Sequence, residues 1–190
     1  MNQIAEILKA SAELKMRLAE NPDMLKKIKD AAELIIQAFK QGKKVLFCGN
    51  GGSAADAQHL AAELSGRFEK DRPPLYAEAL HVNTSYTTAV TNDYSFDIIY
   101  SRLIEAMGNE GDILIGFSTS GNSVNVNKAM EKAHSKKMKT IAFTGKDGGH
   151  IKDLADISLI IPHSNTARIQ EAHITIGHII CKIVEEKLFG

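Results

Sequence analysis

Residues 45–66, VLFCGNGGSAADAQHLAAELSG, combine a strand pattern, a glycine-rich turn and a helix pattern in one short segment. Residues 45–48 form an apolar run typical of a buried strand. Gly49, Gly51 and Gly52 allow the backbone to turn sharply, because they have no Cβ. The order strand, loop, helix is the repeating unit of α/β proteins.

The helix that follows this turn carries paired polar groups. Ser53 is predicted to be its N-cap, and a loop that ends at a helix N-terminus favours an anion. His59 and Glu63 are four residues apart, so their side chains lie on one face of the helix. They could be an ordinary surface pair or part of a site.

The same unit recurs along the chain. Strands are predicted near residues 76–82, 112–117, 140–143 and 157–161, and helices at 85–90, 95–107, 124–136 and 167–188, with the polar turn 91–93 between the first two helices. This alternation predicts an α/β fold, a doubly wound and mainly parallel sheet of about five strands flanked by helices.

Two further helices, near residues 4–18 and 24–39, precede the first strand. They are not needed to connect parallel strands, so they either cover the sheet or pack on another subunit. We therefore divide the single domain 1–190 into an N-terminal helical oligomerisation segment (1–41) and an α/β core (42–190). The apolar surface of the closing helix between residues 174 and 184 also predicts a homo-oligomer.

The composition excludes several classes of protein. Since 23 basic residues balance 23 acidic ones, nothing suggests a nucleic-acid partner. The chain has no apolar run of about eighteen residues and no signal-peptide pattern, which predicts a cytoplasmic protein without a membrane partner. Cys48 and Cys181 lie in apolar surroundings and are interpreted as reduced structural thiols.

A second loop, residues 118–123, follows the strand predicted at 112–117. It offers three consecutive hydroxyl groups, on Ser118, Thr119 and Ser120, and then Ser123 at a helix start. Hydroxyls and backbone N–H groups at a helix N-terminus suit a phosphate monoester, although such residues can also simply form a turn and a cap. Both loops lie at carboxyl ends of strands, where open α/β sheets bind ligands.

Residues 49–54, GNGGSA, also fit the dinucleotide fingerprint G-x-G-x-x-A. That fingerprint expects an acid at the end of the next strand, about twenty residues on, to hold the ribose. Glu69 and Asp71 lie at that distance but precede Pro73, and the next strand ends without an acid. A nicotinamide-binding oxidoreductase is therefore disfavoured.

Gln170 and His178 lie eight residues apart on the closing helix, on a similar face. If this helix meets the one that carries His59 and Glu63, a carboxylate and an imidazole could transfer protons beside a carbonyl. The same side chains would also suit a divalent metal such as zinc. Whether the two helices meet is left open by the sequence.

Five segments, CGNGGSAADAQHLAAELSGRF, TND, GFSTSGNS, FTGKDGG and RIQEAHITIGH, resemble in this order the sugar isomerase (SIS) domain family, and within it the phosphoheptose isomerases. The resemblance covers nearly the whole chain. It implies the SIS fold and the isomerisation of sedoheptulose 7-phosphate to D-glycero-D-manno-heptose 7-phosphate, the entry to bacterial heptose nucleotide synthesis. It also implies a homotetramer with sites between subunits.

The resemblance implies a role for each matching residue. Glu63 would be the catalytic base and His178 its partner acid. The zinc ligands, for one zinc per subunit, would be His59, Glu63, Gln170 and His178. Substrate contacts would come from Asn50, Gly51, Gly52, Ser53, Glu63, Arg67, Asn92, Asp93, Ser118, Thr119, Ser120, Ser123 and Gln170. Ala167 departs from the pattern, because some isomerases have an acid there.

A non-catalytic SIS protein that binds the replication initiator DnaA is the main alternative. In that relative the acid and the histidine at the positions of Glu63 and His178 are missing, whereas this chain has both. A sugar-phosphate-sensing regulatory domain is disfavoured, because the chain has no room for an attached DNA-binding domain.

Overall fold

The computed structural model describes residues 2–190. The helices are α1 (Asn2–Ala19), α2 (Pro22–Lys40), α3 (Gly52–Ser65), α4 (Thr84–Asp93), the 3-10 helix η1 (Phe96–Ile98), α5 (Ile99–Met107), α6 (Val124–Ser135), α7 (Ile151–Leu154) and α8 (Thr166–Phe189). The strands are β1 (Val45–Gly49), β2 (Ala77–Ala79), β3 (Ile113–Ser118), β4 (Lys139–Gly145) and β5 (Ile157–Ile161).

The strands form one parallel sheet in the order β2-β1-β3-β4-β5. The predicted doubly wound five-stranded sheet is thus confirmed. Since β2 and β3 flank β1 on opposite sides, the strand order reverses beside β1. Open α/β sheets bind ligands in the crevice at such a reversal, at the carboxyl ends of the strands.

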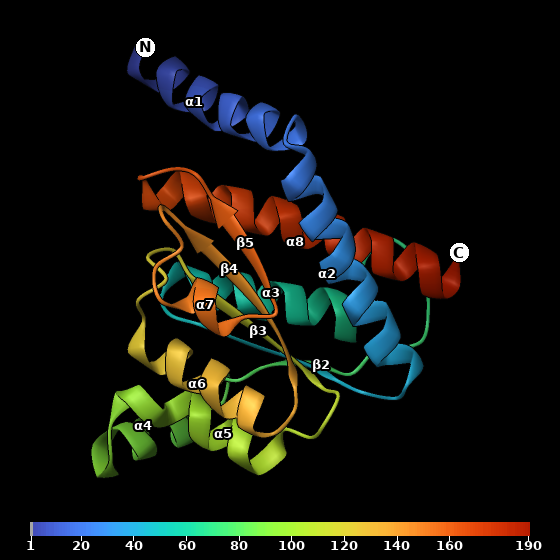
Figure 1. The fold of residues 1–190 in the computed structure, drawn as a ribbon, viewed down its shortest axis with the longest axis vertical. Coiled ribbons are helices and arrows are strands. Elements are labelled where there is room, and N and C mark those ends of the chain that lie inside the picture. Colours follow the sequence, from blue (N-terminus) through green and yellow to red (C-terminus); the bar gives the residue numbers. More distant parts are fainter. Residues whose placement is uncertain (1) are drawn as a thin grey trace.

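Alternation along each strand divides the interior into two cores. Val45 and Phe47 pack into a core with α1, α2, α3 and α8, whereas Leu46 and Cys48 pack into one with α5, α6 and α7. Successive side chains of a strand point to opposite faces, so a continuous apolar run covers both. Figure 1 shows the resulting layers, with α2, α3 and α8 on one side of the sheet and α5 and α6 on the other.

The two N-terminal helices differ in how much of their surface they bury. Asn21 caps α2, its Oδ1 accepting the Met24 amide at 3.1 Å, and α2 packs against α8. In contrast, α1 buries only Leu14 and Leu18 and extends away from the rest of the molecule (Figure 1).

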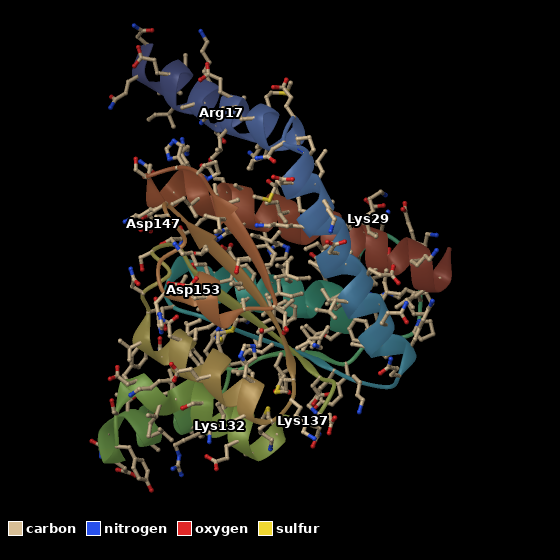
Figure 2. All side chains as sticks on the ribbon, viewed as in Figure 1. Arg17, Lys29, Lys132, Lys137, Asp147 and Asp153 are labelled. Carbon is tan, nitrogen blue, oxygen red and sulfur yellow. The ribbon has the colours of Figure 1, made fainter. Side chains whose placement is uncertain are left out.

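Charged side chains cover the outside of the molecule. Figure 2 draws the side chains and labels six charged ones, Arg17, Lys29, Lys132, Lys137, Asp147 and Asp153. Among the helices of residues 2–190, none is long and apolar enough to cross a membrane.

Two local predictions were wrong. Ser53 is not the N-cap of α3, because the helix already begins at Gly52 and Gly51, at φ +56°, takes the cap position. Residues 91–93 are not a turn between helices but the last turn of α4. The break comes after them, since the 3-10 helix η1 begins only at Phe96.

Candidate functional site

The first loop connects β1 to α3 at the carboxyl edge of the sheet. Its sharp turn depends on Gly51, whose φ of +56° an L side chain rarely adopts. The buried Tyr100 holds the loop from α5, its hydroxyl donating to the Gly49 carbonyl at 2.5 Å. No side chain caps α3; the Ser53 and Ala54 amides donate instead to the backbone carbonyls of Asn50 and Gly51, each at 3.0 Å.

The second loop connects β3 to α6. The Ser118 and Ser123 hydroxyls lie 2.9 Å apart, and Ser123 makes no capping bond to α6 although it holds the N-cap position. By comparison, α2, α4 and α8 each begin at an asparagine whose side chain accepts a first-turn amide. The loop thus presents hydroxyls together with uncapped helix N–H groups, a combination suited to phosphate.

A third loop, between β4 and α7, packs directly against the second. A Cβ on Gly121, at φ +71°, would lie 2.0 Å from the Gly148 carbonyl oxygen. The Ile151 amide donates to the Gly121 carbonyl at 2.9 Å, and the His150 amide donates to Asn122 Oδ1 at 3.1 Å. These contacts fix the shape of the second loop.

Asn50 and Asn125 join the first loop to the first turn of α6. Each amide donates to the other, at 2.8 and 2.9 Å, and Asn125 is buried. The predicted site residues did not include Asn125. The sequence offered only one signal for Asn125, an amide side chain between Val124 and Val126 directly after the hydroxyl loop. Amide side chains are too common at helix starts for this signal to be informative.

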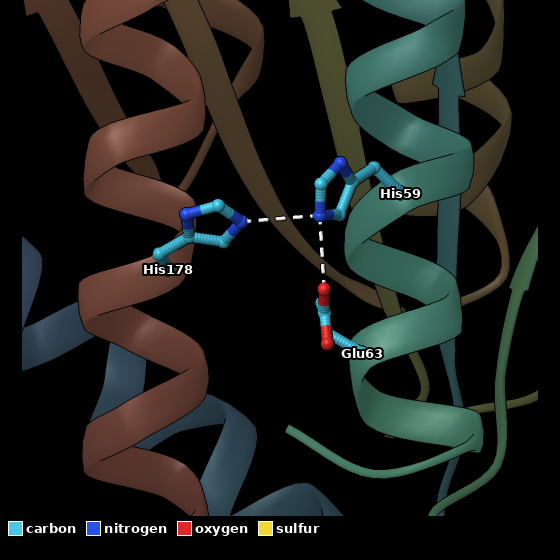
Figure 3. Close-up of side chains that lie close together, drawn as sticks. All are labelled: His59, Glu63 and His178. Atoms are coloured by element: carbon cyan, nitrogen blue, oxygen red, sulfur yellow. Dashed lines mark hydrogen bonds and ion pairs between the residues drawn. The ribbon is translucent and has the colours of Figure 1, made fainter. Parts of the chain in front are cut away.

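His59 and Glu63 on α3 meet His178 on α8 (Figure 3). His59 Nε2 lies 2.9 Å from Glu63 Oε1 and 3.2 Å from His178 Nε2. The side chain of His59 is 48% exposed and that of Glu63 is 23% exposed. The three groups therefore line an accessible surface where α3 and α8 meet. These two helices are far apart in the sequence but adjacent in space.

The donor atoms of these three side chains fit a divalent cation. One atom from each of His59, Glu63 and His178 lies within 4.8 Å of the others. His59 Nε2 faces both a carboxylate oxygen and a second imidazole nitrogen, and one proton cannot fully satisfy both contacts. Two imidazoles and a carboxylate are among the ligand sets that zinc prefers.

Gln170, the fourth predicted ligand, lies on α8 against the first loop. A Cβ on Gly52 would lie 2.6 Å from Gln170 Nε2, so the amide of Gln170 packs directly on this glycine. Ser53 is buried just behind it. The structure thus brings α8, which also carries His178, into contact with the glycine turn.

Other predicted residues lie outside this cluster. Arg67 is exposed just beyond the end of α3. Asn92 and Asp93 are exposed at the end of α4, where Asn92 Nδ2 donates to Asp93 Oδ1 at 2.8 Å. Apart from this bond to each other, Asn92 and Asp93 make no hydrogen bond to a predicted site residue among residues 2–190.

Asp56, one turn before His59 on α3, was also not predicted. Burial raises the pKa of its carboxyl to about 6, and the charge of the nearby His59 opposes this only partly. Asp56 Oδ2 is buried without a hydrogen-bond partner among residues 2–190. Phe68 covers the other side of the cluster, with its ring centroid 5.6 Å from that of His178.

The family model for the SIS domain matches residues 8–145. The chain is 52% identical over 189 residues to a phosphoheptose isomerase of Clostridium acetobutylicum, covering 100% of this chain and 96% of the relative. It is 50% identical over 186 residues to one of Aquifex aeolicus, covering 98% and 96%.

Solved structures agree with these relatives. A phosphoheptose isomerase from Neisseria gonorrhoeae matches with a TM-score of 0.91 at 42% identity, over 97% of this chain and 98% of that one. Another, from Francisella tularensis, matches with a TM-score of 0.92 at 40% identity, over 97% of each chain. This chain belongs to the phosphoheptose isomerases, within the SIS domain family.

Proposed function

We propose that this protein is an aldose–ketose isomerase that converts sedoheptulose 7-phosphate to D-glycero-D-manno-heptose 7-phosphate. The observation that carries the proposal is the meeting of Glu63 and His178 beside His59, on α3 and α8, the two helices that also meet at the glycine turn through Gly52 and Gln170. The relatives that match over nearly the full length are phosphoheptose isomerases, which supports this substrate.

Substrate binding is assigned to the loops. Ser118, Thr119, Ser120 and Ser123 bind the phosphate with the N–H groups of α6. Asn50, Gly51, Gly52 and Ser53 contact the sugar from the first loop, with Gln170 beside them. The reciprocal amide bonds of Asn50 and Asn125 fix the distance between the two loops, and so the distance between the phosphate and the reacting carbons.

Glu63 is the proposed base. It removes the proton from the hydroxyl-bearing carbon next to the carbonyl, and the electron pair of that C–H bond forms the C=C bond of an enediol or enediolate. The proton is then returned to the neighbouring carbon, while His178 transfers the proton between the two oxygens. Side chains in such roles typically contribute about 10²–10⁴-fold to the rate.

Zinc is the proposed cofactor, one per subunit, held by His59, Glu63, Gln170 and His178. When bound, it would polarise the substrate oxygens and stabilise their negative charge. A carboxylate bound tightly to a metal is a weaker base, so the roles proposed for Glu63 compete. We infer that Glu63 acts as the base when its carboxylate is not bound to the metal.

The proposed assembly is a homotetramer in the cytoplasm, with sites between subunits. The exposed apolar residues of α1, which include Ile4, Ile7 and Leu8, support a second copy as the partner. Arg67, Asn92 and Asp93 are proposed substrate contacts. Asn92 and Asp93 end α4, which packs on the opposite face of the sheet from α3 and α8, and this position is explained if subunits complete one another's sites. The product would enter heptose nucleotide synthesis for lipopolysaccharide or related glycans.

Replacing Glu63 tests the proposed reaction. Glu63→Gln keeps the shape of the side chain but cannot accept the carbon-bound proton, so turnover should fall by about 10²–10⁴-fold. Heptose phosphate formation and the incorporation of solvent deuterium into the product measure this step. Glu131→Gln, at an exposed position of α6, is the matched control and should retain activity. Near-normal turnover by a folded Glu63→Gln protein would refute the assignment of the base.

A further inference from the structure

Arg72 and Glu185 form a buried ion pair next to the helices that carry the proposed site. Arg72 Nε donates to Glu185 Oε2 at 3.0 Å, and the two side chains are 1% and 2% exposed. The Phe189 ring covers the guanidinium, with its centroid 5.7 Å from Arg72 Cζ. Burying two charges costs several kcal/mol per ion unless further hydrogen bonds satisfy them. The remaining hydrogen-bond partners of Arg72 and Glu185 therefore show which parts of the chain this ion pair holds in place.

Glu185 binds the segment that follows α3. Its Oε1 accepts the amides of Glu69 and Lys70 at 2.9 and 2.7 Å, and its Oε2 accepts that of Phe68 at 3.1 Å. Glu185 itself lies on α8. The carboxylate therefore attaches the chain leaving α3 to the helix that carries His178.

Arg72 binds the end of α3 itself. Its Nη2 donates to the backbone carbonyl of Glu63 at 2.8 Å, and its Nη1 donates to that of Leu64 at 2.8 Å and to that of Gly66 at 3.1 Å. The last four carbonyls of a helix have no partner within the helix. Arg72 thus supplies donors to the last turn of α3, where the Leu64 carbonyl also accepts the Leu75 amide at 3.1 Å.

Glu63 lies in that last turn, since α3 ends at Ser65. Helix ends open more easily than helix interiors, and a proton-transfer group on a fraying turn would be poorly placed. We propose that Arg72 and Glu185 are positioning residues that hold Glu63 opposite His178. This role rests on the proposed isomerase function.

A second buried ion pair provides a comparison within the same chain. Lys44 and Asp112 have side chains 10% and 3% exposed, and they lie at the starts of β1 and β3. That is the edge of the sheet opposite the loops. The side-chain hydrogen bonds of this pair join only residues 44, 109 and 112, none of which lies on α3 or α8. Loss of the Lys44–Asp112 pair should therefore cost stability without releasing the end of α3.

The experiment compares Glu185→Gln with Asp112→Asn, each of which replaces a buried carboxylate by its amide. Arg72→Lys is the second variant at the site; it keeps a positive charge beside Glu185 but loses the planar set of donors. For Glu185→Gln and Arg72→Lys, kcat should fall by about 10²-fold with KM changed by less than about threefold, because the contacts assigned to the two loops, which bind the phosphate and the sugar, remain. Hydrogen exchange of the amides at residues 62–66 should accelerate in both variants.

Asp112→Asn should lower the melting temperature but leave kcat and the exchange of residues 62–66 unchanged. All variants are assayed below their unfolding transitions, and Arg72→Lys decides the question if Glu185→Gln does not fold. Faster exchange with unchanged kcat, or unchanged exchange, would overturn the positioning role. Failure of the wild type to isomerise heptose phosphate would instead refute the proposed function. The hydrogen-exchange measurement does not depend on that function, so the two failures can be told apart.

Discussion

His173 is a buried imidazole whose environment favours the neutral form. It lies within 6 Å of both Phe117 and Phe143, at centroid distances of 5.9 and 5.6 Å. Its Nε2 lies 3.0 Å from the Thr144 carbonyl, to which it donates. Burial lowers the pKa of His173 to about 4, and the hydrogen bond to Thr144 offsets this only in part.

This shift predicts a dependence of stability on pH. The pKa of His173 is about 6.5 in the unfolded chain and about 4 in the folded protein, so between these values the unfolded state binds more protons. The stability associated with neutral His173 is complete above pH 6.5 and is lost as the pH falls towards 4. Melting temperatures measured from pH 7.5 to 4 should therefore fall more steeply for the wild type than for His173→Asn.

The control for this titration is His150→Asn, which changes an exposed histidine. It should keep the slope of the wild type. Equal slopes for the wild type and His173→Asn would contradict the assignment of this transition to His173.

At the scale of elements, the packing of α3 on α8 determines the site. Gly177 and Leu60, which lie next to His178 and His59 in the sequence, are in contact where the helices meet. A Cβ on Gly177 would lie 2.4 Å from Leu60 Cδ1 and 2.7 Å from Leu60 Cδ2. Glycine is therefore required for the close approach of the two helices.

Gly177→Ala should separate α3 from α8. Inserting a methyl group into a packed contact costs about 1–3 kcal/mol of unfolding free energy, and the wider spacing should reduce turnover because the proton-transfer groups are displaced. Chemical denaturation and heptose phosphate assays measure the two effects.

Leu60→Ala removes the atoms with which the new methyl group would clash. Alone it leaves a cavity and should cost about 2–5 kcal/mol. Combined with Gly177→Ala it should cost less than the sum of the two single changes, because the methyl group fills part of that cavity. Additive losses would show that the two residues do not limit the helix spacing.

At the scale of the whole molecule, α1 leaves an apolar surface in solvent. Ile4 is 66% exposed, Ile7 is 47% exposed and Leu8 is 67% exposed; they lie on the same helical stripe as Leu14 and Leu18, which are buried. A contiguous exposed apolar face is typical of a protein–protein contact. A symmetric oligomer would bury this surface against copies of the same chain.

Replacing Ile4 and Leu8 together by lysine should therefore dissociate the assembly, because two charges would have to be buried in the contact. Light scattering should report a mass several times that of the chain for the wild type and a smaller mass for the variant. Glu13→Lys, which changes charge at an exposed position of α1, should keep the wild-type mass. A monomeric wild type would refute the proposed oligomer.

The sequence alone determined the order of the elements and the chemical character of the two main loops. Strand runs such as residues 45–48, and the glycines and hydroxyls after them, are local patterns that depend on neighbouring residues. For the same reason the local errors at Ser53 and at residues 91–93 were small. There the conformation of Gly51 and the continuation of α4 prevailed over the capping and turn preferences of the side chains.

Only the tertiary structure decided which distant residues meet. His59 and His178 are 119 residues apart in the chain, yet their Nε2 atoms lie 3.2 Å apart. Similarly, Asn125 contacts Asn50 and Glu185 contacts Arg72 across long separations. Helical spacing shows that His59 and Glu63 share a face, but the packing of α3 on α8 through Gly177 and Leu60 determines what that face meets.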